Sequence, residues 1–279
     1  MHDLIAAFFG YDFLSRALLA GVLIALCAAL LGVSLVLKNY ALIGDGLSHV
    51  GFGALAIAAA ANLAPLAVSV PIVVAAAFLL LRIRDRGGIR GDSAIALVST
   101  SALAAGVLVT SLTGMNTDIS AYLFGSILAM SREDVIFAAV LSGLVLILYI
   151  LFYHKIFTVT FDESFARATG THTGFYDTLL SVLTAVTVVL GMRLMGTLLI
   201  SSLIIFPALS AMRVCRRFFS VIVVSAVISV VCVAVGLSAS YLYSLPAGAS
   251  VVAANAAVFV LFALTGLLLS RIRRRKALR

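Results

Sequence analysis

Apolar runs separated by short polar segments make up almost the whole chain. Nine such runs, each about 15–22 residues long, are rich in Leu, Ala, Val and Ile. An α-helix of roughly 20 residues crosses the hydrocarbon core of a bilayer, so the pattern predicts an all-α, polytopic transmembrane helical bundle. The first and sixth runs are the weakest, which leaves eight spans as the alternative. The nine predicted spans are residues 17–37, 40–61, 66–81, 94–112, 134–153, 178–192, 196–211, 221–242 and 251–269.

The segments outside the runs differ in character. Residues 1–16 mix aromatic and charged side chains, which predicts an interfacial segment, and without a basic start they do not resemble a cleavable signal peptide. Residues 114–131 contain too short an apolar stretch to cross a bilayer, so we expect a short interfacial or re-entrant helix there. Ser131, with Asp134 three positions later, forms a capping-box pattern that predicts the start of the fifth span.

Composition supports a membrane protein with a single domain, residues 1–279. The chain is 63% hydrophobic and 11% charged, with a net charge of +8; soluble domains average about 25% charged residues. Most Lys and Arg residues lie between spans and fall on one side when the spans are counted, so the positive-inside rule makes that side cytoplasmic. This distribution explains the positive charge without nucleic acid as a partner. The basic segments are residues 82–90, 154–177, 213–217 and the tail, 271–279. The second of these is the longest polar loop, and residues 160–170 within it predict a short helix that Asp162 and Glu163 favour at its start and Gly170 ends.

An acidic residue inside a predicted span is the most unusual feature of the sequence. Asp45 lies in the second span, where an aspartate costs roughly 2.5–3.5 kcal/mol on insertion scales. His49 follows four positions later, on the same helix face, as two ligands of one divalent metal ion would. Small residues beside them, including Gly44 and Ser48, allow another helix to approach closely. The alternative is an Asp–His hydrogen bond that only neutralises two buried groups, but inside a span we favour a functional role.

Motifs of common enzymes are missing from the sequence. It contains no H-E-x-x-H, no G-x-S-x-G and no P-loop, since none of its three lysines follows a glycine. The chain therefore does not bind ATP by a P-loop. A transporter built from it is a channel, a gradient-driven carrier, or the membrane half of a pump whose ATPase is another chain.

Several stretches resemble one family of transport proteins. Residues 42–49, with the sequence LIGDGLSH, resemble a signature of the permease subunits of zinc, manganese and iron ABC importers, the ABC-3 family. Residues 161–170, 196–208 and 245–250 resemble, in order, its cytoplasmic docking segment, its proline-containing helix and its last outward turn. Gly46 and Ala247 depart from the family pattern, which has Ala and Ser there, and neither is a proposed ligand.

The resemblance implies a fold like that of type II ABC importers in a prokaryotic plasma membrane, with the C-terminus cytoplasmic. Two permease chains would pair with two ATP-binding cassette ATPase subunits and an extracytoplasmic metal-binding protein. ATP hydrolysis belongs to the ATPase, and the metal is the transported substrate rather than a permanently bound cofactor. The residues expected to couple the chain to its ATPase are Asp162, Glu163, Phe165, Ala166, Arg167 and Gly170. Those expected in helix packing or gating are Gly44, Ser48, Pro207, Pro246 and Gly248.

The number of ligands points independently to two copies of the chain. One Asp and one His are too few for a selective site, because zinc sites usually have about four ligands. A two-fold axis beside the second span would bring two Asp45 and two His49 side chains around one ion. Carboxylate and imidazole ligands suit Zn²⁺, Mn²⁺ and Fe²⁺ alike. The main alternative is a proton- or sodium-coupled carrier; the others are a type II importer of siderophores or cobalamin, and an intramembrane metalloprotease.

Overall fold

The computed structural model describes residues 12–86, 91–114, 125 and 131–277. All regular secondary structure within these ranges is helical, as predicted. The helices are α2 (Asp12–Leu37), α3 (Ile43–Ala60), α4 (Pro65–Arg86), α5 (Gly91–Leu112), α7 (Arg132–Leu151), α8 (Tyr153–Phe161), α9 (Glu163–Ala168), α10 (Thr173–Met195), α11 (Thr197–Val214), α12 (Phe218–Tyr243) and α13 (Ala247–Ala277).

Each predicted span corresponds to one long helix. Among the described residues, eight helices are long and apolar enough to cross a bilayer, and α4 adds a shorter apolar stretch, Ala67–Leu80. The first and sixth spans start earlier than predicted, at Asp12 and Thr173. Their first turns carry polar residues, and composition does not distinguish a helix that leaves the bilayer from a loop. Residues 12–16 of the predicted interfacial segment thus belong to α2.

Some predicted segments lie outside the described residues. These are residues 1–11 of the interfacial segment and all of the 114–131 segment except Gly114, Gly125 and Ser131. The backbone of α13 continues through the predicted basic tail to Ala277.

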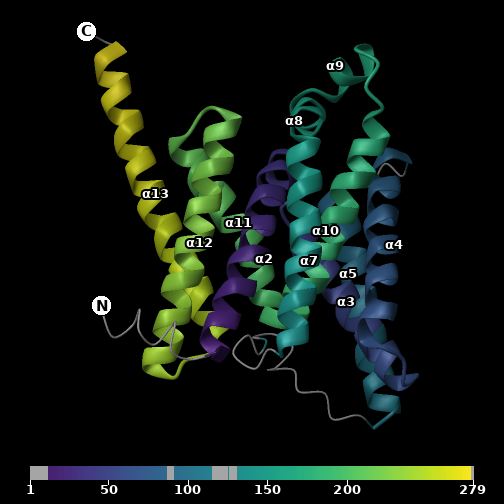
Figure 1. The fold of residues 1–279 in the computed structure, drawn as a ribbon. Helices are drawn as coiled ribbons and strands as arrows, with labels where there is room; N and C mark the ends of the chain where they lie inside the picture. Colours follow the sequence, from purple (N-terminus) through teal and green to yellow (C-terminus); the bar gives the residue numbers. More distant parts are fainter. Residues whose placement is uncertain (1–11, 87–90, 115–124, 126–130, 278–279) are drawn as a thin grey trace.

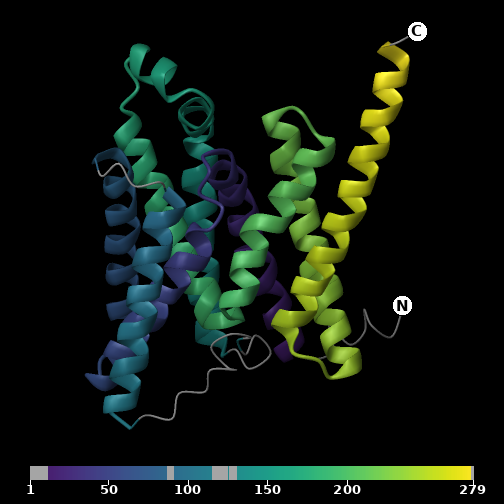
Figure 2. The same cartoon turned by 180° about the vertical axis from the view of Figure 1, so that it is seen from behind.

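Helix α2 is central to the bundle, where it contacts α7, α10, α11 and α12. Helices α3, α4 and α5 pack together on one side, and α13 stands at the opposite edge against α11 and α12 (Figure 1, Figure 2). The end of α4, helices α8 and α9, the α11–α12 turn and the end of α13 all lie at the same end of the bundle (Figure 1). The described parts of the segments predicted to share one side of the membrane therefore do share one end, which we call the basic end.

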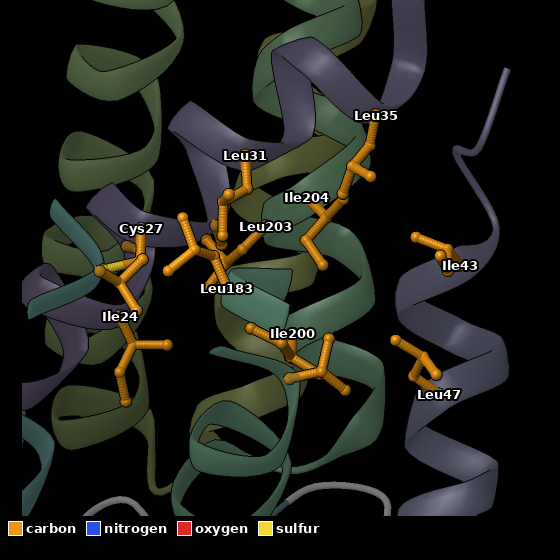
Figure 3. Packing of buried hydrophobic residues seen from close by; sticks show 14 of the residues in the cluster. Ile24, Cys27, Leu31, Leu35, Ile43, Leu47, Leu183, Ile200, Leu203 and Ile204 are labelled. Carbon is orange, nitrogen blue, oxygen red and sulfur yellow. The ribbon is translucent and has the colours of Figure 1, made fainter. Parts of the chain in front are cut away.

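Helix α11 packs against both α2 and α3. Its buried residues Ile200, Leu203 and Ile204 lie among side chains of α2 and α3 (Figure 3). A Cβ atom at Gly44 of α3 would meet Ile204 Cδ1 at 2.6 Å, so α3 approaches α11 closely only because this residue has no side chain. The apolar contact fixes the side of α3 that is buried and leaves another side available for polar residues.

The segment predicted as a polar loop, residues 154–177, is largely helical. Helix α8 buries Ile156 and Val159, and this amphipathic pattern was missed because the segment is short and rich in polar residues. The short helix expected at 160–170 is present as α9: Asp162 caps it by accepting a hydrogen bond from Phe165 N at 2.8 Å. Gly170 follows with a left-handed φ of +78°, the conformation that favours glycine at the end of a helix.

Candidate functional site

Asp45 and His49 lie next to each other in the first two turns of α3. The His49 Nε2 and Asp45 Oδ2 atoms are 3.7 Å apart. About a quarter of the His49 side chain and half of the Asp45 side chain, 26% and 49%, are uncovered. The helical spacing therefore places the two groups together, as the sequence predicts, and both remain accessible from outside the chain.

A tight connection between α2 and α3 positions this pair. Asn39 adopts a left-handed φ of 61°, and Tyr40 N donates to Leu35 O at 2.8 Å, so the chain reverses direction just after α2. Helix α3 then begins beside α11, where Ser201 Oγ donates to Asp45 Oδ1 at 3.4 Å. This hydroxyl was not predicted as part of the site, because it is 156 positions away in the sequence.

A pocket of about 280 Å³ opens beside the pair, between α3 and α5. Its α5 wall is mostly apolar, with the hydroxyl groups of Ser99 and Thr100 added. Two glycines let the helices approach: a Cβ at Gly46 would meet Ile95 Cγ2 at 2.5 Å, and one at Gly53 would meet Ala102 O at 2.7 Å. The lining residues are Leu42, Asp45, His49, Ile95, Ala96, Ser99, Thr100 and Leu103.

The donor groups that one chain brings together are too few for a closed metal site. No group of three or more His, Cys, Asp or Glu side chains is close enough to hold a metal in the described part of the chain. Asp45 and His49 offer oxygen and nitrogen donors, and Ser201 adds a weak oxygen donor. The buried Nδ1 atom of His49 has no hydrogen-bond partner among the described residues. This set is short of the roughly four ligands of a closed zinc site.

The predicted coupling residues surround α9 at the basic end of the bundle. Ala166 is fully buried and anchors the helix, whereas Phe165 is 58% exposed. Arg167 pairs with Glu163 at 2.5 Å and donates through Nε to Thr173 Oγ1 at 3.0 Å. A hollow of about 470 Å³ lies between α8, the connection after α9 and the start of α10, and its lining residues are Lys155, Gly170, Thr171, His172, Phe175 and Tyr176.

The predicted packing residues are divided between the site and other places. Gly44 lies against α11, and the Ser48 hydroxyl donates to the Asp45 carbonyl at 2.7 Å, so both support the site. Pro207 is buried within α11. Pro246 and Gly248 are at the α12–α13 turn, at the end opposite α9 (Figure 1). None of these last three residues lines the Asp45 pocket.

Comparison with known proteins identifies the family. The model of the ABC 3 transport family matches residues 10–266, nearly the whole chain. The chain belongs to this family. The manganese import system permease protein ScaB of Streptococcus gordonii is 27% identical over 93% of this chain and 94% of its own length. The high-affinity zinc uptake system membrane protein ZnuB of Haemophilus influenzae is 30% identical over 90% of this chain and 97% of its own length.

A solved structure of a related protein agrees with the fold. A chain of PsaBC from Streptococcus pneumoniae, in complex with Fab, superposes with a TM-score of 0.83 at 28% identity, and the match covers 94% of both chains. The predicted helical bundle and the resemblance to the permeases of metal ABC importers are thus confirmed. The named relatives are membrane subunits rather than enzymes, and the chain is a multi-span membrane permease like them.

Proposed function

We propose that this protein is the membrane-spanning subunit of an ATP-driven importer of a divalent transition metal, Zn²⁺, Mn²⁺ or Fe²⁺. The observation that carries the proposal is the Asp45–His49 pair on the pocket side of α3, at a separation of 3.7 Å. A carboxylate and an imidazole together suit these three ions, and carboxylate alone would suit Mg²⁺ or Ca²⁺ better. Relatives named for manganese and zinc uptake support the same class of substrate.

Two copies of the chain complete the site in this proposal. An aspartate that is half uncovered within a bilayer is costly unless a polar partner covers it. A two-fold axis beside α3 places the same two ligands of a second copy opposite, giving two carboxylates and two imidazoles around one ion. The exposed apolar face of α5, with Leu97 62% and Leu108 63% exposed, lies next to the pocket and offers surface for that contact.

A separate ATP-binding cassette ATPase supplies the energy by docking at α9. The exposed ring of Phe165 on α9 favours a protein partner there, since large aromatic side chains are typical interface anchors, and the hollow lined from Gly170 onwards, just after α9, adds a concave surface. The basic end of the bundle is then cytoplasmic by the positive-inside rule, and so is the end of α13. The protein is a multi-pass component of a plasma membrane.

The transport cycle follows from this arrangement. An extracytoplasmic metal-binding protein releases the ion at the end that carries the α12–α13 turn, Pro246 and Gly248. The ion moves to a transient site made by Asp45 and His49 of both copies. ATP binding and hydrolysis act on α9 and rock the helices between outward-open and inward-open arrangements. The ion then leaves at the basic end.

Metal uptake into vesicles tests the proposal. Vesicles contain this chain with its ATPase and receive the binding protein, and Zn²⁺, Mn²⁺ and Fe²⁺ are supplied in parallel. We expect ATP-dependent uptake of one ion, lost in Asp45→Ala and His49→Ala although both variants still assemble with the ATPase. The matched control is His154→Ala, because His154 is an exposed histidine outside the Asp45 pocket.

Two outcomes would reject parts of the proposal. Normal uptake by both site variants would exclude the Asp45–His49 site. Uptake that does not require ATP but depends on a proton or sodium gradient would favour the secondary carrier. It would also contradict the proposal that an ATPase docks at α9.

A further inference from the structure

A charged pair joins two segments that are far apart in the sequence. Lys38 Nζ contacts Asp177 Oδ1, although 139 positions separate the two residues. Only 6% of the Lys38 side chain and 18% of the Asp177 side chain are exposed. The pair connects the residue that follows α2 with the second turn of α10, towards the basic end of the bundle. The site described above does not include it.

On one side, the first turns of α10 and the contacts of Thr173 link this pair to α9. Asp177 and Thr173 are four positions apart in α10, so they share a helix face. Thr173 Oγ1 accepts a hydrogen bond from Arg167 Nε at 3.0 Å, and Arg167 is held by Glu163 within α9. A displacement of α9 therefore acts on the first turn of α10, one turn before Asp177.

On the other side, the pair leads to the metal-binding helix. Lys38 is the first residue of the short connection 38–42 between α2 and α3. This connection is tight: Lys38 N donates to Ser34 O at 3.1 Å, and Ile43 N donates to Tyr40 O at 3.1 Å. Asp45 follows two residues after Ile43. A force on the Lys38 side chain is thus transmitted to the start of α3. Lys38 is seven positions before Asp45, the first proposed ligand.

We propose that the Lys38–Asp177 pair transmits the movement of α9 to α3 and so couples ATP use to the Asp45–His49 site. The inference rests on the proposed function and adds positioning residues to it. Separating two largely buried opposite charges loses their mutual attraction, which is stronger in the low-dielectric interior than in water. The second turn of α10 and the α2–α3 connection consequently move together. Without the charges, α9 and α10 can move while α3 stays in place.

A double apolar variant separates this role from simple stabilisation. Replacing both partners of a buried ion pair by apolar residues often leaves a protein equally stable, whereas removing one partner does not. We therefore choose Lys38→Met/Asp177→Leu, in the complex with the ATPase in vesicles. The readouts are ATPase rate, metal ions transported per ATP hydrolysed, and equilibrium binding of radioactive metal.

The expected result is uncoupling with an intact complex. ATPase rate and metal binding stay near wild type, and the metal transported per ATP falls about two- to thirty-fold, the range of coupling changes seen at residues that touch no ligand. The charge-reversed pair Lys38→Asp/Asp177→Lys restores most of the coupling. Wild-type transport per ATP in the double apolar variant would overturn the proposal. We expect the single variants Lys38→Met and Asp177→Asn to lose coupling. A charge-reversed pair that loses as much coupling as these single variants would also overturn the proposal.

The same vesicles distinguish this proposal from the function on which it rests. If the wild-type complex takes up no metal with ATP, or if Asp45→Ala transports normally, the proposed function fails. If wild type transports metal, Asp45→Ala does not, and the double apolar variant is fully coupled, only the role of the Lys38–Asp177 pair fails.

Discussion

Replacing Gly53 by alanine tests how α3 and α5 form the pocket. A Cβ at this position would lie 2.7 Å from Ala102 O, and ordinary van der Waals contact begins at 3.4 Å. The α5 backbone must therefore retreat by about 0.7 Å, and overpacking of this kind typically costs about 1–3 kcal/mol. Gly53 is one turn beyond His49 on the same face of α3, so the retreat also moves the α5 wall away from the Asp45–His49 pair.

The matched control is the same substitution on another helix. Gly143 in α7 has no atom within 4 Å of an added Cβ. There the change contributes only the better helix propensity of alanine, about 1 kcal/mol in soluble helices. We expect Gly53→Ala to lower the apparent melting temperature in detergent and to reduce metal uptake, and Gly143→Ala to leave uptake unchanged and to keep or raise the melting temperature.

Thermal unfolding of the purified chain and vesicle uptake measure both effects. The direction of the difference in melting temperature between the two variants matters more than the size of either shift. Both variants replace glycine by alanine and differ only in the surroundings of that residue. A melting temperature for Gly53→Ala equal to or above that of Gly143→Ala, with normal uptake, would refute the close α3–α5 contact.

Three smaller perturbations examine single contacts. Asp162→Ala removes the cap that holds Phe165 N, costs about 1 kcal/mol of local stability and should speed hydrogen exchange in α9; unchanged exchange would contradict the cap. Ser201→Ala removes the 3.4 Å contact to Asp45, and we expect metal affinity to fall by less than about threefold, because a hydrogen bond this long is weak; a loss as large as that of Asp45→Ala would make Ser201 an essential ligand. Gly170→Ala forces a side chain into a left-handed conformation, at about 1–2 kcal/mol, and should weaken ATPase binding in pull-down titrations; wild-type affinity would show that this turn does not hold α9.

Local features of the structure followed closely from the sequence. Ser131 Oγ accepts from Asp134 N at 3.1 Å, and Asp134 Oδ2 accepts from Ser131 N at 3.3 Å, which is the predicted capping box. The neighbouring positions of Asp45 and His49 also follow from helical periodicity. Such features were predictable because each depends on residues within about one helical turn.

Long-range features did not follow from the sequence. Nothing in the pattern pairs Lys38 with Asp177 or brings Ser201 to Asp45, because these contacts depend on how separate helices pack. The start of α2 at Asp12 was missed for a different reason: hydropathy marks the apolar part of a helix, and a helix extends beyond that part wherever its backbone hydrogen bonds continue. The depth of the pocket likewise depends on the α3–α5 contact rather than on any motif.

The ends of the helical bundle restrict how two copies can be joined. Helix α2 begins at the end opposite the one where α13 finishes (Figure 1). A linker from α13 of one copy to α2 of a second copy in the same orientation would have to pass through the whole bilayer. A soluble peptide cannot do this, because its backbone would lose its hydrogen bonds in the hydrocarbon. A single-chain dimer for placing one mutant beside one wild-type site therefore needs an added transmembrane helix as its linker, whereas co-expression of two differently tagged chains needs none.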